Sequence, residues 1–217
     1  MSSCVDSLVA EQVGPPAGGG SIPTSTLHVR RATLREVQPV VERLHYSHSC
    51  FGVTSDACYA AQGPWEHRDG FLYRFTVVGA AIFGKPAAYN VTSKYAQAGR
   101  RLLELRRFVL ENGLPRNSES RCLAFMLRDL KHVGVDTVLS YADPLYGHSG
   151  VIYAACGFRR LGKTAPRTHY EWLGKRYPDR NLHQVNFPFH RELRIAVQSG
   201  EAVPVHIPGK IIWVKDL

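Results

Sequence analysis

From Thr137 to Phe158 the chain reads Thr-Val-Leu-Ser-Tyr-Ala-Asp-Pro-Leu-Tyr-Gly-His-Ser-Gly-Val-Ile-Tyr-Ala-Ala-Cys-Gly-Phe. Its first residues are mainly apolar or β-branched, which is typical of a buried strand. Asp143-Pro144 ends that strand, because proline has no N–H for the ladder and restricts the residue before it. A short helix follows, with His148 or Ser149 as its expected cap and Gly157 as its stop. The stretch therefore predicts a strand, a turn that begins with a carboxylate, and a helix.

Asp143 stands at the carboxyl end of the predicted strand, where α/β sheets place their ligands. Two interpretations fit this position: a carboxylate of a functional site, or a residue that only caps the turn. The positional rule favours the first, and we predict that Asp143 belongs to a site.

The end of the stretch carries a resemblance to a known group of enzymes. Tyr153-Ala-Ala-Cys-Gly157-Phe158 resembles the Tyr-x-x-x-Gly-Phe ending of the acyl-CoA motif in GNAT-type N-acyltransferases. The longer string, Ser140-Tyr-Ala-Asp-Pro followed by Gly147-His-x-Gly-x-x-Tyr153, resembles the phage Mom family, GNAT-like enzymes that modify adenine in DNA. This similarity runs from about Leu103 to Lys175. It implies an α/β (α+β) fold with a mixed central sheet flanked by helices. It also implies addition of a carbamoylmethyl or acyl-type group to the N6 amine of adenine, which protects phage DNA from restriction.

The amino-terminal part differs in composition from the rest. Residues 1–26 contain Gly-Pro-Pro-Ala-Gly-Gly-Gly and are too rich in Gly and Pro to bury a core, so we expect a flexible tail. Residues 27–217 are expected to form a single GNAT-like domain with a basic extension from about residue 175 to 217. The expected first elements are a strand at 28–32, a helix from 34 to about 45, and strands at 51–62 and 71–83. Thr33 and Glu36 form a capping box before the helix, and this order of elements is how a GNAT domain opens.

Residues 102–110, Leu-Leu-Glu-Leu-Arg-Arg-Phe-Val-Leu, read as a further strand. Strict alternation separates two sets, Leu103, Leu105, Arg107 and Val109 on one face and Glu104, Arg106 and Phe108 on the other. The charges indicate either an edge strand with charges in solvent or a strand that borders a site. The resemblance implies the second, a strand that lines the acyl-donor cleft, and it assigns Arg107 to donor binding.

A helix begins near Asn117, with apolar residues at helical spacing at Leu123, Met126, Leu127 and Leu130. In GNAT enzymes the corresponding helix start binds the CoA pyrophosphate on backbone N–H groups. The usual Gln/Arg-x-x-Gly-x-Gly/Ala element is absent here. The resemblance implies acetyl-CoA or another acyl donor, and the residues available for its anionic groups are Arg116, Ser118 and Arg121. Ser120 is expected to hydrogen-bond the donor or the substrate.

An exocyclic amine of a base is a poor nucleophile, because its lone pair is delocalised into the ring. It gains from a base that takes its proton and from groups that stabilise charge on the donor. We assign the first role, or orientation of the amine, to Asp143. Tyr153 resembles the tyrosine with which GNAT enzymes protonate the departing thiolate, although a half-buried tyrosine with a satisfied hydroxyl is the other interpretation. Ser120 completes the predicted catalytic set, and Tyr141 and His148 are assigned to substrate binding.

After Phe158 a strand at 159–163 is expected to pair with an antiparallel strand at 168–173, followed by the basic loop 174–180. Basic residues are interleaved here with the aromatic residues Tyr170, Trp172, Tyr177 and Phe187. Such a pattern fits a surface that contacts phosphates and stacks on bases, or simply the core of a late hairpin. We assign Lys175 and Arg176 to DNA binding. Residues 207–214 are predicted to form a closing strand.

The sequence His45-Tyr46-Ser-His48-Ser-Cys50 follows the first helix. His and Cys side chains at short spacing can bind zinc or iron, although this spacing fits no standard zinc finger. The resemblance implies an iron-dependent step, for which His45 and His48 are the candidate ligands. Alternatively, His45-Tyr46 lines a pocket for a flipped base.

The composition limits the classes of protein to which this sequence can belong. The 217 residues are 44% hydrophobic and 21% charged, as in globular domains. No apolar run approaches ~20 residues, so a membrane span is not expected. The five cysteines are scattered and odd in number, which favours a reducing cytoplasm. The residues Met-Ser-Ser-Cys-Val-Asp show no basic region followed by an apolar one, so a secretory signal is not expected.

The formal net charge is +9, and residues 157–217 carry eleven basic and five acidic groups. This bias favours a polyanionic partner, and nucleic acid, as double-stranded or locally opened DNA, is the leading candidate. A merely soluble basic surface fits the charge equally well, so charge alone does not decide between the two. Because a duplex hides the amine, such an enzyme must flip the adenine or act on open DNA. Two alternatives are an N-acetyltransferase that acts on a protein or small-molecule amine and a non-enzymatic DNA-binding protein. The missing glycine-rich element counts against the first of these.

Overall fold

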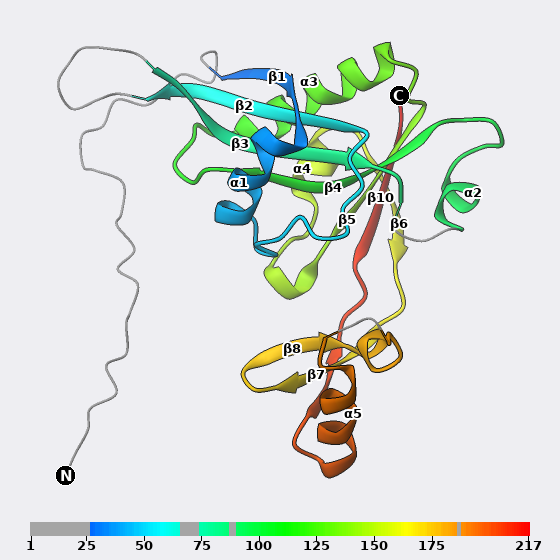
Figure 1. Cartoon of the computed structure of the whole chain (residues 1–217). Coiled ribbons are helices and arrows are strands. Elements are labelled where there is room, and N and C mark those ends of the chain that lie inside the picture. Colours follow the sequence, from blue (N-terminus) through cyan, green and yellow to red (C-terminus); the bar gives the residue numbers. More distant parts are fainter. Residues whose placement is uncertain (1–26, 66–73, 87–89, 186–187) are drawn as a thin grey trace, which may run out of the picture.

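The computed structural model describes residues 27–65, 74–86, 90–185 and 188–217. The predicted tail 1–26, the first residues of the predicted strand 71–83, and Phe187 lie outside these ranges. Within them the strands form a seven-stranded sheet of order β1-β2-β3-β4-β5-β10-β6 and a three-stranded sheet of order β8-β7-β9 (Figure 1). The predicted α+β fold, a mixed central sheet flanked by helices, is confirmed.

The elements of the large sheet and its helices are β1 (His28–Ala32), α1 (Leu34–Leu44), β2 (Ala57–Trp65), β3 (Arg74–Gly84), α2 (Val91–Tyr95), β4 (Leu102–Leu110), α3 (Ser118–His132), β5 (Thr137–Ala142), α4 (Val151–Ala155), β6 (Arg159–Lys163) and β10 (Ile211–Asp216). The smaller sheet comprises β7 (Arg167–Trp172), β8 (Lys175–Pro178) and β9 (Val203–Ile207), with α5 (His190–Ser199). Short 3₁₀ turns lie at Pro144–Tyr146 and Asp179–Leu182. The predicted strand–helix–strand–strand opening is confirmed.

Helices cover both faces of the large sheet. On one face α1 buries Val37, Val40 and Val41 against small side chains of β2 and β3, and its predicted capping box is formed, with Thr33 accepting the Glu36 N–H. α3 and α4 cover the other face, where the main core gathers Leu123, Met126 and Tyr153. The cleft described below lies between these two helical layers.

The smaller sheet is inserted between two adjacent strands of the large one. β6 leads out of the large sheet, β7 to β9 form the second sheet with α5, and β10 returns to lie between β5 and β6 (Figure 1). The second sheet has an apolar cluster of its own, built from Leu193, Ala196 and Ala202 with Tyr170, Trp172 and Tyr177 packed against it. The stretch expected as one basic extension, about 175–217, is thus divided between the two sheets.

Two expected strands differ from the structure. The predicted strand 51–62 begins only at Ala57, because Phe51-Gly52 form a turn in which Gly52 has φ +68°. The predicted pairing of 159–163 with 168–173 is wrong: β6 pairs with β10, and β7 pairs with β8 and β9. A neighbouring strand in sequence was the natural partner to expect, but the returning strand β10 takes that place.

β4 and β5 lie parallel and then separate. Their paired residues run only from Leu102 with Thr137 to Glu104 with Leu139, although β4 continues to Leu110 and β5 to Ala142. The unpaired carboxyl halves of the two strands leave a gap in the sheet, which is where a ligand can enter such a fold.

A β-bulge in β4 changes the expected alternation. Ile82 pairs with Arg107 and Phe83 with Leu105, so Arg106 is the extra residue. Beyond the bulge Phe108 and Leu110 pack with the main core, whereas Val109 packs on the α1 side. The predicted grouping of Val109 with Leu103 and Leu105 is therefore wrong, because a bulge shifts the side-chain period by one residue.

Candidate active-site cleft

A cleft of about 480 Å³ opens where β4 and β5 separate. This volume is in the range of small-molecule sites. Six of the predicted site residues line it: His45, Arg107, Tyr141, Asp143, His148 and Tyr153. They come from the end of α1, from β4, from the end of β5, and from the turn and helix that follow it.

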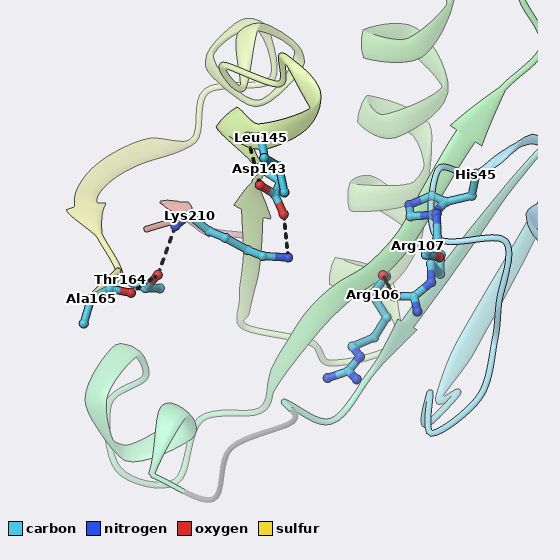
Figure 2. A network of polar contacts seen from close by, with 9 residues as sticks. His45, Arg106, Arg107, Asp143, Leu145, Thr164, Ala165 and Lys210 are labelled. Atoms are coloured by element: carbon cyan, nitrogen blue, oxygen red, sulfur yellow. Dashed lines mark hydrogen bonds and ion pairs between the residues drawn. The ribbon is translucent and has the colours of Figure 1, made fainter. Parts of the chain in front are cut away.

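Asp143 is buried, with 4% of its surface exposed, and both of its oxygens are engaged. Oδ1 accepts the N–H of Leu145 at 3.1 Å and thus caps the 3₁₀ turn. Oδ2 lies 2.9 Å from Nζ of Lys210 (Figure 2). Asp143 therefore caps the turn and also presents an ion-paired carboxylate to the cleft, and its role in a functional site stays a prediction.

Lys210 was not foreseen as part of this site. Its backbone is fixed to the segment after β6, since its N–H donates to Thr164 Oγ1 and its carbonyl accepts the Thr164 N–H. In the antiparallel register Ile211 faces Ala142, so the preceding Lys210 falls opposite Asp143. The sequence does place a lysine just before the predicted closing strand. That position indicates a contact with Asp143 only once the pairing of β10 with β5 is known.

Tyr153 reaches the cleft from α4 and is 9% exposed. Burial raises the pKa of its phenol. The nearby Ser140 hydroxyl acts in the opposite direction and lowers that pKa, although Ser140 Oγ has no hydrogen bond of good geometry among the described residues. Its ring packs against Phe158 and Trp213. A phenol that stays protonated and is held by packing is suited to donate a proton.

The helix that carries Tyr153 is not capped as expected. Its N-cap is Gly150 with φ +87°, and no side chain accepts there, so the predicted caps His148 and Ser149 are wrong. A Cβ at Gly150 would collide with the indole of Trp213. The close approach of this turn to Trp213 therefore requires glycine.

A cluster of aromatic rings borders the cleft, and of the two stacked tyrosines in it Tyr46 is a lining residue. Tyr46 stacks on Tyr146 with 4.2 Å between ring centroids, and its other neighbours are His45 at 4.2 Å and His148 at 5.6 Å. Tyr46 is 37% and Tyr146 50% exposed, so these rings are accessible. Such a cluster offers a surface on which a planar base can stack.

His45 is buried and neutral. Desolvation, followed by the charge of Arg107, lowers its pKa to about 4. Its Nδ1 accepts the backbone N–H of Ser47 at 3.1 Å, and because that N–H can only donate, the ring proton lies on Nε2. His45 therefore presents an N–H donor rather than a cation at neutral pH.

This low pKa predicts a pH-dependent loss of stability. Below pH 6.5 the unfolded chain protonates His45 while the folded protein excludes that proton, so stability falls as the pH falls toward 4. Between pH 7.5 and pH 5 the wild type should lose about 2 kcal/mol more of its free energy of unfolding than His45→Gln. Urea denaturation at both pH values measures this difference. If wild type and His45→Gln lose the same free energy of unfolding, His45 is not held neutral in the folded protein.

Arg106 and Arg107 of β4 line the cleft, and Figure 2 shows Arg107 beside His45. Arg107 Nε donates to the carbonyl of Ser49 at 3.0 Å, which ties the loop after α1 to β4. Arg106 Nη1 is ion-paired with Glu104 at 3.4 Å without hydrogen-bond geometry, and Arg106 Nε is buried without a hydrogen-bond partner among the described residues. Unsatisfied buried donors of this kind are available to an anionic or carbonyl group of a ligand.

The residues predicted at the start of α3 do not line the cleft. The Ser118 hydroxyl is buried and donates to the Pro115 carbonyl, and the Ser120 hydroxyl donates to the Asn117 carbonyl. Arg116 and Arg121 are exposed. The nearest part of this helix is Glu119, which does border the cleft.

Lys175 and Arg176 lie on β8 of the second sheet, away from the cleft lining. Both are exposed, and Arg176 Nε donates to Glu171 at 3.1 Å. Tyr177 and Trp172, which follow and precede them, pack against the cluster under α5. The hairpin-core interpretation thus fits these two rings.

The predicted metal ligands do not form a metal site. His45 Nδ1 is bonded to Ser47, and His48 Nδ1 lies 2.9 Å from the Glu42 carbonyl. Within the described residues, no three His, Cys, Asp or Glu side chains gather as metal ligands would. His45 and His48 therefore have no third ligand beside them in the part of the chain that the structure describes. In the same ranges no helix has the length and apolar character needed to cross a membrane.

The model of the Mom protein family matches residues 26–206. The methylcarbamoylase mom of Escherichia phage Mu is 31% identical over 120 residues, 54% of this chain and 49% of that protein, so the chain spans about half the length of this relative. Two solved structures are similar over 88% of this chain and 99% of theirs. They are a Bacillus subtilis acetyltransferase in complex with CoA (TM-score 0.44, 13% identity) and an IAA acetyltransferase from Bacillus cereus (TM-score 0.46, 10% identity).

Proposed function

Because this chain belongs to the Mom protein family, we propose that it is a transferase that modifies adenine in DNA, adding a carbamoylmethyl or acyl-type group to the N6 amine. The observation that carries this proposal is that Asp143 and Tyr153 line one cleft whose border is aromatic and basic. The phage Mu relative is named a methylcarbamoylase. Modification of phage DNA in the host cell, and protection from restriction, would follow from that activity.

In the proposed complex the target adenine leaves the duplex and enters the cleft. Unstacking a base costs a few kcal/mol, which contacts in the pocket must offset. The stacked rings of Tyr46 and Tyr146 offer the adenine a face, and the Nε2–H of His45 offers a donor to a ring nitrogen. Asp143 then accepts a hydrogen bond from the N6 amine.

For an acyl-type donor the residues divide the proton transfers. The N6 nitrogen bonds to the donor carbonyl carbon, and the bond from that carbon to the thiol sulfur breaks. Asp143 takes the proton lost by the amine, and Tyr153 gives its proton to the departing thiolate. Lys210 holds the Asp143 carboxylate in place beforehand, and the buried donors of Arg106 are suited to the carbonyl oxygen of the donor.

Donor binding is proposed to extend from the cleft toward the start of α3. Arg107 lines the cleft but is engaged with Ser49, so its role is to shape the wall and add positive charge. Arg116 and Arg121 are exposed near the helix start and can meet phosphates of acetyl-CoA or another acyl donor. Ser118 and Ser120 contribute structure, because their hydroxyls are bonded to backbone carbonyls.

The experiment that tests this function is mass spectrometry of nucleosides from cells that express the protein. We expect a modified deoxyadenosine in that DNA and none in DNA from cells with an empty vector. Its mass increment identifies the transferred group. Unmodified deoxyadenosine at good expression would contradict the proposal and favour an acetyltransferase that acts on a protein or small amine.

The exposed lysine of β8 leads to a prediction about DNA affinity. If Lys175 contacts a phosphate, Lys175→Gln should weaken binding to all duplex sequences alike and reduce the slope of log K against log salt by about 1. Lys131→Gln, a matched change at an exposed lysine of α3, should leave the slope unchanged. Fluorescence anisotropy at several salt concentrations measures both, and equal slopes for wild type and Lys175→Gln would exclude the contact.

A further inference from the structure

Phe51 is the most exposed large apolar side chain in the described part of the protein. It is 95% exposed, compared with 77% for the next two, Leu173 and Val185. A buried phenylalanine typically stabilises a fold by about 1.5–3 kcal/mol, and this one contributes nothing of that kind. Single exposed apolar residues are common on surfaces, so its meaning depends on where and how it is held.

The loop that presents Phe51 is anchored on both sides of it. The Phe51 N–H donates to Ser49 Oγ at 3.0 Å, and the Val53 N–H donates to the Cys50 carbonyl at 3.1 Å. Cys50 and Val53 pack against the cluster under α1. The flanking side chains are thus turned inward, while Phe51 is left outside at the tip of a hydrogen-bonded turn.

The same loop forms part of the cleft. It starts with His45 and Tyr46, which line the cleft, and the Ser49 carbonyl is bonded to Arg107, which also lines it. Two residues span at most about 7 Å, so the Phe51 backbone lies close to this point of attachment. Phe51 is not itself a lining residue of the cleft, but its backbone is tied within that short distance to the cleft wall at Arg107.

We propose that Phe51 is the wedge that enters the base stack and occupies the space vacated by the target adenine. Proteins that distort DNA commonly insert an apolar side chain between base steps, and a flipped base leaves such a gap. Insertion would bury the phenylalanine ring against bases and hold the adenine in the cleft. This inference rests on the proposed function. It adds a residue that is needed when the substrate is duplex DNA and not when it is single-stranded DNA.

The test compares Phe51→Ala with wild type on one DNA fragment, supplied as duplex and as heat-denatured single strands. A protein-free filtrate of host cells supplies the donor, and modified deoxyadenosine is measured by mass spectrometry. We expect the initial rate of Phe51→Ala on the duplex to fall tenfold or more, with a change of less than twofold on single strands. Phe51→Trp should retain most of the duplex activity.

Phe125→Ala serves as the matched control, since Phe125 is another exposed phenylalanine and lies on α3. Its rate should equal that of wild type on both substrates. Equal losses of Phe51→Ala on duplex and single strands, or no loss on the duplex, would overturn the wedge while leaving the proposed function intact. If the wild type modifies neither substrate, the proposed function fails, and the wedge fails with it.

Discussion

Asp143→Asn is expected to lower the rate of adenine modification by about 10²–10⁴-fold, the usual contribution of a general base. Asparagine has nearly the same shape, and its carbonyl oxygen can still accept the Leu145 N–H that caps the turn. It can neither take the amine proton nor attract Lys210 as a carboxylate does. The measurement is the initial rate of formation of modified deoxyadenosine by the purified variant.

The variant Lys210→Met distinguishes the catalytic role of the Asp143 carboxylate from the contribution of its ion pair with Lys210. It removes the ion pair but leaves the carboxylate, so we expect a smaller loss of rate than in Asp143→Asn. A urea denaturation curve for each variant controls for misfolding. If Asp143→Asn keeps more than a tenth of the wild-type rate, Asp143 acts only as the cap of the turn.

Tyr153→Phe is expected to lower the same rate by about 10²-fold or more, because the departing thiolate loses its proton donor. Phenylalanine keeps the packing against Phe158 and Trp213, so the fold should be preserved. Burial raises the pKa of Tyr153, which keeps the phenol protonated at neutral pH.

Tyr59→Phe is the matched control for the loss of a buried hydroxyl. Tyr59 belongs to the same core, and its hydroxyl donates to Asp129, far from the cleft lining. It should cost about 1.5–3 kcal/mol of stability, as for a hydrogen bond to a charged group, and leave the rate per folded molecule unchanged. Similar rate losses in the two variants would mean that Tyr153 acts through the fold rather than on the donor.

Local sequence was enough to predict the elements whose signals are local. The capping box of Thr33 and Glu36 fixed the start of α1, and the stretch from Thr137 to Phe158 gave β5, the turn and α4. Because Asp143 and Tyr153 both follow β5 and are ten residues apart, their approach to one cleft was also predictable.

Features that depend on distant pairing were not predictable. Lys210 reaches Asp143 only because β10 returns between β5 and β6, and a single sequence does not reveal that register. At the bulge, Arg106 of β4 has no paired residue in β3. A prediction that assumed strict alternation along β4 therefore put Val109 on the wrong face of the sheet. The second sheet escaped prediction for the same reason, since β7 pairs with the distant β9.

The most direct test of the shared cleft is a double-mutant cycle on the rate of deoxyadenosine modification. The four proteins are wild type, Asp143→Asn, Tyr153→Phe and the double variant. Groups that serve one reacting centre lose their effects together, so the double variant should be within about tenfold of the slower single variant. Rate losses that multiply in the double variant, or no modified deoxyadenosine from the wild type, would contradict a single cleft in which both residues act on one adenine.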